Sequence, residues 1–300
     1  MKNHPMSRRA FLQTTGLAAT ALAVGATAAR AEGVSWPIGC FNRPWVNDKL
    51  HWTYDTALDG IQAAGYKTTG LLTATETEPF IASSATPEHL ASLREKIAAH
   101  GLKATMAALR TKNDLPLDEQ ITDMRRQIDN GKTVGVEFLL TFGVDRTAYY
   151  QNYYNLMRDA AAYAQDRGLK LVLKPHGGAS GAAEEILRCL ERVNHPNFKI
   201  WFDAGNIIYY TGKDPIEQLK PVVSQVTGFC AKDCDKERGN VWLEFGQGKV
   251  DFPAVFAELK RARFKGPVMV ECCAQSDSAE AVTASARRNR EFLERLFATL

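Results

Sequence analysis

Four segments in the C-terminal half of the chain each place polar residues at the end of an apolar strand. They are LKLVLKPHGG (169–178), FKIWFDAGN (198–206), VTGFCAKDC (226–234) and GPVMVECC (266–273). Side chains alternate between the two faces of a β-strand, so Lys174 and His176 share a face. Cys230 and Lys232 also share one, and Glu271 lies on the face of Met269. Successive strands with polar residues at the same end are typical of the active rim of a (β/α)8 barrel.

The first 31 residues have the features of an export signal. Ser7-Arg8-Arg9-Ala10-Phe11-Leu12 fits the twin-arginine pattern, and Ala29-Arg30-Ala31 has the form of a cleavage site. The intervening stretch, 16–29, is too short and too rich in Ala, Thr and Gly to span a bilayer stably, and no other apolar run is long enough. We therefore expect residues 1–31 to be removed, the protein to be periplasmic, and no stable membrane span.

The net charge gives no reason to expect a nucleic-acid partner. The whole chain carries 37 Lys and Arg against 34 Asp and Glu, a formal charge of +3. Four of the basic residues, Lys2, Arg8, Arg9 and Arg30, belong to the signal, which leaves 33 basic residues against 34 acidic ones. The mature chain is therefore close to neutral, without the basic excess of a nucleic-acid-binding domain.

Residues 32–300 are predicted to form one barrel domain, because their number suits a single barrel and no linker divides them. An open doubly wound sheet is disfavoured, because no G-x-G-x-x-G turn follows the first strand. The four segments above are the last four strands, and the others are predicted at 35–41, 67–72, 103–109 and 135–142. Helices are predicted at 51–64, from Thr86-Pro87 onward, and at 117–130, 149–166, 182–193, 215–226, 252–264 and 279–297.

Several short motifs resemble those of the xylose-isomerase-like barrel superfamily, which includes sugar isomerases and epimerases, inosose dehydratases and endonuclease IV. The motifs are Phe202-Asp203-Ala204-Gly205-Asn206 with Asp214-Pro215, then Lys232-Asp233, Gly246-Gln247-Gly248 and Glu271. The resemblance covers roughly the whole chain after the signal. It implies a single (β/α)8 barrel with its site at the carboxyl ends of the strands.

The resemblance also implies a divalent metal, held by Glu, Asp, His and Glu after strands five to eight. Asp203 and Glu271 match this pattern, whereas Lys174 and Cys230 replace the other two ligands. The ammonium of Lys174 balances much of the charge that a metal would neutralise. Two alternatives remain open: no metal, or one Mn²⁺, Zn²⁺ or Mg²⁺ held by His176, Asp203 and Glu271.

Three residues are predicted to carry the chemistry. Glu271 is the expected base, and Lys174, with a pKa lowered by burial, is the expected acid or enediolate stabiliser. Asp203 would orient Lys174, and His176 would bind a hydroxyl or relay a proton. The predicted substrate-binding residues are Asn206, Lys232, Asp233, Trp45 and Arg110, although a loop acid, a solvated charge and ordinary packing remain alternatives for Asp233, Lys232 and Trp45.

Five of the six cysteines lie near the ends of strands one, seven and eight, which adjoin in a closed barrel. They are Cys40, Cys230, Cys234, Cys272 and Cys273. An exported protein meets an oxidising compartment, which allows one disulfide among them. Small buried hydrophobes and a soft-metal site are the alternatives.

These features favour an exported carbohydrate-modifying enzyme that abstracts a proton next to a carbonyl, giving isomerisation or epimerisation. Export argues against a phosphorylated metabolite, so we expect an unphosphorylated small carbohydrate as the substrate. A lyase or hydratase acting on a keto-sugar or glycoside begins with the same proton abstraction and is one alternative. A non-catalytic sugar-binding barrel is another, because half of the family's metal ligands are replaced.

Overall fold

The computed structural model describes residues 33–46, 52–75 and 78–300, and these belong to one compact unit. The predicted export signal, 1–31, lies outside the described residues. Within the described part of the chain, no helix combines the length and the apolar character that a membrane crossing requires.

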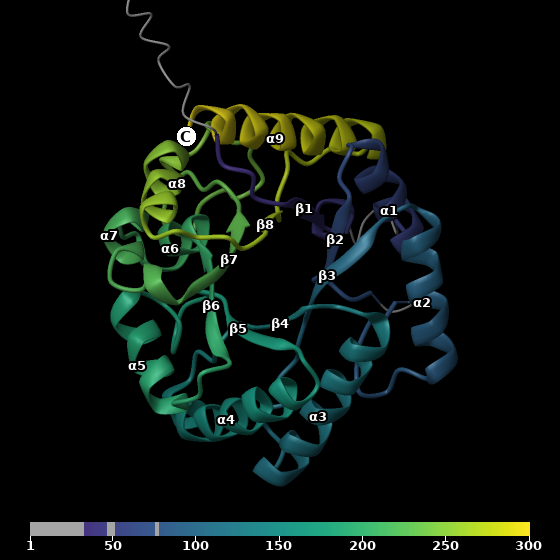
Figure 1. Ribbon diagram of the computed structural model, residues 1–300, viewed down its shortest axis with the longest axis vertical. Helices are drawn as coiled ribbons and strands as arrows, with labels where there is room; N and C mark the ends of the chain where they lie inside the picture. The colour runs from purple at the N-terminus through teal and green to yellow at the C-terminus, as the bar shows by residue number, and fades with distance from the viewer. Residues whose placement is uncertain (1–32, 47–51, 76–77) are drawn as a thin grey trace, which may run out of the picture. The chain divides into compact units, whose positions relative to one another are not determined.

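Eight parallel strands close into a barrel in chain order, and β1 pairs with β8 (Figure 1). The predicted (β/α)8 barrel is therefore confirmed. The strands are β1 (Ile38–Phe41), β2 (Thr68–Leu71), β3 (Lys103–Ala108), β4 (Phe138–Thr141), β5 (Lys170–Leu173), β6 (Phe198–Asp203), β7 (Val226–Ala231) and β8 (Val268–Val270).

Helices surround the barrel, and α9 lies beside α1 where the ring closes (Figure 1). Several begin at a side-chain cap: Thr86 Oγ1, for example, accepts a hydrogen bond from the backbone N–H of His89, with Pro87 in the first turn. The α-helices are α1 (Tyr54–Ala63), α2 (Pro87–Ala99), α3 (Leu117–Val134), α4 (Tyr150–Asp166), α5 (Ala183–Val193), α6 (Ala204–Thr211), α7 (Pro215–Leu219), α8 (Phe252–Arg261) and α9 (Ala279–Thr299). Short 3₁₀ turns are η1 (Arg43–Trp45), η2 (Thr147–Tyr149) and η3 (Val223–Gln225).

The connection from β6 to β7 differs from the prediction of one helix over 215–226. Helix α7 ends at Leu219, two residues before Pro221, which lacks the N–H that a continuing helix needs. Helix α6 begins directly after β6, with Asp203 as its cap. Because α6 starts where the strand stops, it fixes the direction of the Asp203 side chain as well as the path of the chain.

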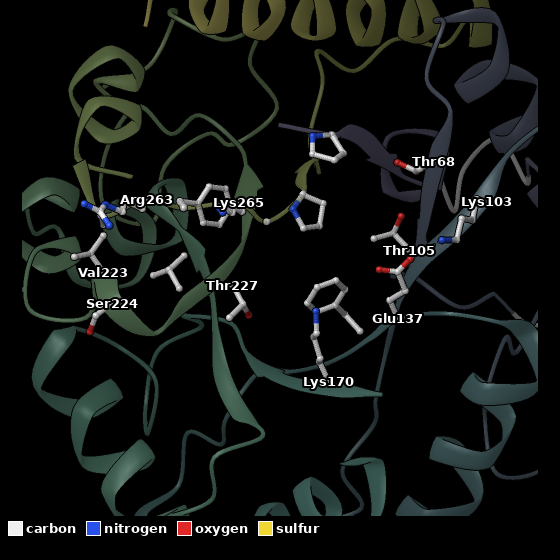
Figure 2. Close-up of a pocket in the computed structure, with 17 residues that line it drawn as sticks. Thr68, Lys103, Thr105, Glu137, Lys170, Val223, Ser224, Thr227, Arg263 and Lys265 are labelled. Atoms are coloured by element: carbon white, nitrogen blue, oxygen red, sulfur yellow. Dashed lines mark hydrogen bonds and ion pairs between the residues drawn. The ribbon is translucent and has the colours of Figure 1, made fainter. Parts of the chain in front are cut away.

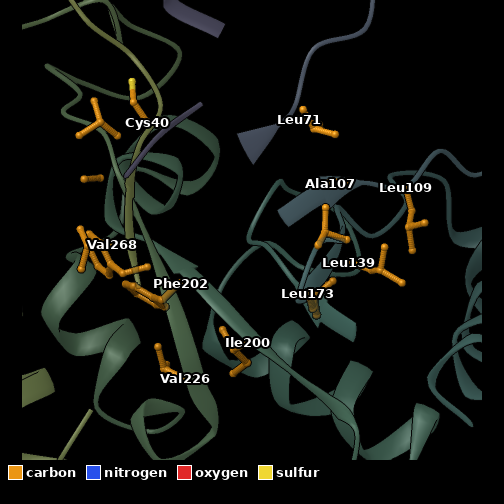
Figure 3. Packing of buried hydrophobic residues seen from close by; sticks show 14 of the residues in the cluster. Cys40, Leu71, Ala107, Leu109, Leu139, Leu173, Ile200, Phe202, Val226 and Val268 are labelled. Carbon is orange, nitrogen blue, oxygen red and sulfur yellow. The ribbon is translucent and has the colours of Figure 1, made fainter. Parts of the chain in front are cut away.

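The core has two layers, one on each side of the strands. Outward-facing strand residues such as Leu71, Leu139 and Leu173 pack beneath the helices (Figure 3). The barrel interior holds a separate cluster: Phe41, Leu72, Met106, Ala108, Phe138, Leu140, Val172, Trp201, Cys230 and Met269. The Trp201 ring fits because Gly228 is its partner on β7, where a Cβ would lie 2.1 Å from that ring. The interior is thus filled with side chains up to the layer that carries the polar residues.

A pocket of about 550 Å³ opens at the other end of the barrel, where the strands begin (Figure 2). Its lining includes five polar residues at or near the starts of β2 to β5: Thr68, Lys103, Thr105, Glu137 and Lys170. Lys103 and Glu137 form an ion pair with side chains that are 65% and 51% exposed. We call this region the floor pocket.

Candidate active site

Four buried ionisable residues meet at the carboxyl ends of β5 to β8. Lys174 follows Val172 on β5 by two residues, and Asp203 follows Trp201 on β6 in the same way. Lys232 and Glu271 likewise follow the interior residues Cys230 on β7 and Met269 on β8 by two residues. Each is at most 3% exposed. We call them the charged quartet: Lys174, Asp203, Lys232 and Glu271.

The quartet is a ring of alternating charges. Lys174 Nζ lies 3.0 Å from Asp203 Oδ2 and donates a hydrogen bond to Glu271 Oε2. Lys232 Nζ lies 3.1 Å from Asp203 Oδ2 and 3.2 Å from Glu271 Oε1. The four formal charges sum to zero. Such burial is tolerated because each charge is paired, and removing one partner would leave another buried and uncompensated.

The neighbouring charges decide the pKa values in the quartet. Burial alone would raise the pKa of Glu271, but Lys174, Lys232 and Arg43 hold it well below its usual range. Burial alone would lower the pKa of Lys174, but the interactions with Cys230, Glu271 and Asp203 outweigh burial, and its pKa is raised. The prediction of a lowered Lys174 pKa is therefore wrong, because sequence reasoning counted burial without the facing carboxylates.

Glu271 is also poorly suited to the predicted role of base. Its Oε2 accepts hydrogen bonds from Lys174 and from Cys230 Sγ, the latter at 2.7 Å. Its Oε1 contacts Lys232 and lies 3.6 Å from Arg43 Nη1. Because both of its oxygens already contact cationic or thiol donors, Glu271 is better placed to hold the ammonium groups than to take a proton from a substrate.

Asn206, a predicted substrate-binding residue, contacts Lys232 of the quartet. Its side-chain Nδ2 donates to the carbonyl of Pro175 at 2.6 Å, and its Oδ1 accepts a hydrogen bond from Lys232. Its backbone N–H donates to Asp203 Oδ1 at 2.8 Å, so Asp203 caps α6 while Oδ2 faces the lysines. Gly205 permits this close approach, since a Cβ there would lie 2.6 Å from the carbonyl oxygen of Lys232.

Two other predicted substrate-binding residues, Asp233 and Trp45, are buried and hydrogen-bonded within the protein. Asp233 is fully buried, and its carboxylate accepts hydrogen bonds from backbone N–H groups that span the loop after β7. The donors are Cys234, Gly246, Gly248 and Val250. Trp45 is 1% exposed, and its Nε1 donates to Thr283 of α9 at 3.2 Å. Neither side chain has a free surface for a sugar.

His176 lies next to the quartet in a partly exposed position. Its Nε2 is 2.7 Å from the hydroxyl of Tyr210, on α6, and its ring packs edge-on against Phe142 at 5.2 Å between centroids. Burial and the charges of Lys174 and Lys232 lower the pKa of His176 to about 4. The imidazole is therefore neutral at neutral pH, and one of its two nitrogens can accept a proton.

Two arginines complete the described rim. Arg110, after β3, lies with its guanidinium 5.5 Å from the centroid of the Phe142 ring and donates to the carbonyl of Leu72. Arg43, in η1, lies 5.2 Å from the centroid of the Trp242 ring. Arg110 was predicted here and is brought to the rim. We call Arg43, Arg110, Phe142, His176 and Tyr210 the rim residues; Arg110 is exposed, and the other four are partly exposed.

Sequence reasoning missed Arg43 as a contributor to the site, and it did not connect Tyr210 with His176. Arg43 follows β1 by two residues, as Lys174, Lys232 and Glu271 closely follow their strands, so its position in the chain was a usable signal. Tyr210 lies four residues after Asn206, which places both on one face of a helix. That spacing had no meaning while α6 itself was unpredicted.

The residues present do not fit a divalent metal. Ligand atoms of Asp203, Cys230 and Glu271 lie within 4.8 Å of one another, whereas His176, predicted as a ligand, is not part of this group. Both carboxylates already contact two ammonium groups, which would repel a cation. Burial raises the pKa of Cys230 well above its usual range, so the thiol is protonated and a poor ligand.

All six cysteines are free and buried. The predicted possibility of a disulfide among the five near the barrel mouth is therefore wrong, and the alternative of small buried hydrophobes fits. Burial raises the pKa of Cys272 to about 11, and that of Cys273 is raised as well. Thiols with such pKa values are unreactive near neutral pH.

The model of the family described as xylose isomerase-like TIM barrel matches residues 58–296. The chain belongs to this family. A solved member, a xylose isomerase-like TIM barrel protein from Mycobacterium smegmatis in complex with magnesium, has a TM-score of 0.70 at 16% identity. That comparison covers 89% of this chain and 98% of the other, so the barrel fold is shared along nearly its whole length.

The named relatives in this family are enzymes that act on sugars and related polyols. The inosose dehydratase of Clostridium perfringens is 29% identical over 135 residues, which covers 39% of this chain and 44% of that enzyme. This chain thus matches less than half of that relative's length. The L-ribulose-5-phosphate 3-epimerase of Salmonella paratyphi C is 23% identical over 229 residues, covering 69% of this chain and 77% of the other. The chain is therefore related to sugar-modifying enzymes of more than one reaction class.

Proposed function

We propose that the protein is a sugar isomerase or epimerase that moves the proton next to a carbonyl with its own side chains. The observation that carries this proposal is a neutral His176 beside two buried ammonium groups. Proton abstraction next to a carbonyl needs a neutral acceptor for the proton and a positive group for the oxygen that becomes negative. The site holds both, without a metal.

Lys174 is the ammonium best placed to face a substrate oxygen. Its Nζ lies 5.9 Å from the centroid of the Phe142 ring, the same ring that contacts His176 and Arg110. Asp203 and Glu271 hold the ammonium in position before substrate arrives, so little reorganisation is needed as charge develops. The carboxylates serve the reaction by orienting the two lysines.

His176 is the proposed acid–base residue. It takes the proton as the C–H bond breaks, and the electron pair moves onto the carbonyl oxygen to form an enediolate. Transfer of the hydroxyl proton from one enediolate oxygen to the other, and return of the abstracted proton to the neighbouring carbon, complete an isomerisation. Epimerisation needs, in addition, a proton donor on the opposite face of the sugar. The hydroxyl of Tyr210 holds the imidazole orientation throughout.

The test is proton exchange into sugars dissolved in D₂O, followed by NMR on protein treated with EDTA. We expect wild-type protein to exchange the proton next to the carbonyl of a keto-sugar, and His176→Asn to lose about 100-fold or more in rate. Because the pKa of His176 is about 4, the rate should hold from neutral pH down toward that value and fall below it, where the imidazole is protonated. His195→Asn, in the loop between α5 and β6, is the matched control.

Two results would contradict the proposal. Loss of exchange in EDTA with recovery on adding Mn²⁺ would show that a metal supplies the positive charge. Binding of sugars with no exchange and no turnover would support a non-catalytic sugar-binding barrel instead.

A lyase acting on a keto-sugar is the second candidate, because relatives of this chain include inosose dehydratases. The same enediolate would then expel a β-substituent in place of receiving the proton back. Mass spectrometry of the products separates the two reactions. An isomerase or epimerase conserves the mass of the sugar, whereas a dehydratase lowers it by one water.

A further inference from the structure

The rim residues carry positive charge that the described part of the chain does not neutralise. The charged quartet below them sums to zero, and His176 is neutral. Arg43 and Arg110 remain, both near the same opening. These two guanidinium groups lie at one rim, above the charged quartet, which is neutral overall. They create a positive potential that favours an anion.

Arg110 has no carboxylate partner among the described residues. Its guanidinium donates to the carbonyl of Leu72 and lies against the Phe142 ring, and these contacts leave its charge uncompensated. Burial lowers the pKa of Arg110, and the positive charge of Arg43 lowers it further.

Arg43 is only weakly paired. Its closest carboxylate contact in the described chain is Nη1 to Glu271 Oε1 at 3.6 Å, longer than a hydrogen bond, and Glu271 already serves two lysines. Its Nε is buried without a hydrogen-bond partner among the described residues. A buried N–H of a guanidinium without an acceptor indicates a place for one from outside the chain.

Four backbone N–H groups in the turn after β5 are already engaged within the protein. Over 179–182, Ala179 donates to Val144, Ser180 to Gly177, Gly181 to Gly178, and Ala182 to the Glu185 side chain. These four N–H groups are therefore not available to an anion.

We propose that Arg43 and Arg110 bind an anionic group of the substrate, so that the site takes an acidic sugar in preference to a neutral one. The shared chemistry is an oxyanion, supplied by a sugar carboxylate or by a sugar phosphate. This inference rests on the proposed function and adds a substrate class to it. Guanidinium groups suit both oxyanions because they donate two parallel hydrogen bonds. The anion would anchor one end of the sugar while the carbonyl lies near Lys174.

The test is binding measured by calorimetry with D-glucuronate, D-glucose 6-phosphate, D-glucose and inorganic phosphate as probes. We expect the charged sugars to bind wild-type protein about 10-fold or more tightly than glucose, the effect of roughly one additional charge-assisted contact. Arg110→Met should remove that difference, and Arg110→Lys should retain part of it. Arg188→Met, which removes an exposed guanidinium on α5, is the matched control and should leave the preference unchanged. Added NaCl should weaken only the charged probes.

The comparison between probes identifies the source of the anion. Tighter binding of glucuronate than of the phosphate ester indicates a sugar acid, and the reverse order indicates a sugar phosphate. Equal binding of all three sugars, no binding of any charged probe, or an anion preference that survives in Arg110→Met would overturn the proposal. Because binding needs no turnover, the proposed function fails separately, in the proton-exchange experiment.

Discussion

The two ends of the barrel both carry lysine–carboxylate pairs, but they use them differently. At the mouth, Lys174 and Asp203 are 1% and 0% exposed, and each charge contacts two partners. At the floor pocket, Lys103 and Glu137 are 65% and 51% exposed and form a single pair. The same chemical pair is therefore an organised, water-excluded site at one end and a solvated surface feature at the other.

This difference follows from the strand ends at which the residues lie. Residues that follow the strands are covered by the loops and by α6, whereas those that begin the strands open to solvent at the floor pocket (Figure 2). Burial lowers the local dielectric, so a charge at the mouth must be paired and can act strongly on a bound substrate. The mouth is thus the end of the barrel at which we expect the chemistry, as in (β/α)8 enzymes generally.

Removing one charge from the quartet should have the largest effect on stability. Lys174→Met keeps most of the side-chain volume but leaves Asp203 and Glu271 with only Lys232 between them. Breaking a buried ion pair in this way costs about 3–5 kcal/mol in the free energy of unfolding, to be measured by urea denaturation. Lys174→Met combined with Glu271→Gln restores neutrality and should recover most of the loss. A cost of Lys174→Met below about 1 kcal/mol would mean that the quartet is solvated like the floor pair.

The sequence predicted the barrel and brought the right strand ends together, because alternation along a strand depends only on neighbouring residues. It assigned Lys174, Asp203 and Glu271 to one mouth for that reason. It could not show that Lys232 adds a second ammonium between the same carboxylates. It misjudged the pKa of Lys174 because the facing negative charges outweigh burial there. The two-residue alternation along a strand tells on which face a side chain lies, but it does not tell which charges meet across the barrel.

The surroundings of Asp233 and Trp45 could not be predicted for a different reason. Their partners lie far along the chain: Asp233 accepts from Gly246, Gly248 and Val250, and Trp45 donates to Thr283. Such hydrogen bonds depend on how the loops return to the barrel, which local patterns do not record. A polar or aromatic residue in the loop after a strand is therefore a weaker indicator of a binding site than a polar residue that continues the alternation of the strand itself.

Lowering the pH should have a smaller effect on the free energy of unfolding, because a protonated Glu271 still forms hydrogen bonds. Its pKa in the folded protein is held well below the usual value of 4.5, so its ionised form stabilises the fold. That stabilisation is fully present above about pH 4.5 and is lost as the pH falls further. The difference in unfolding free energy between wild type and Glu271→Gln should therefore shrink below that pH, when urea midpoints are compared from neutral to acid conditions. A difference that does not change with pH would show that Glu271 is not held by the lysines.

The smallest effect is expected at the floor pocket. Lys103→Met removes the partner of Glu137, but both side chains are exposed, and water replaces the lost contact. The free energy of unfolding should change by less than about 1 kcal/mol, and the change should diminish further in high salt, which screens exposed pairs. Urea denaturation of Lys103→Met and Lys174→Met under the same conditions compares the two ends of the barrel directly. A cost at Lys103 above about 2 kcal/mol would contradict the comparison, because it would mean that the floor charges depend on one another as those of the quartet do.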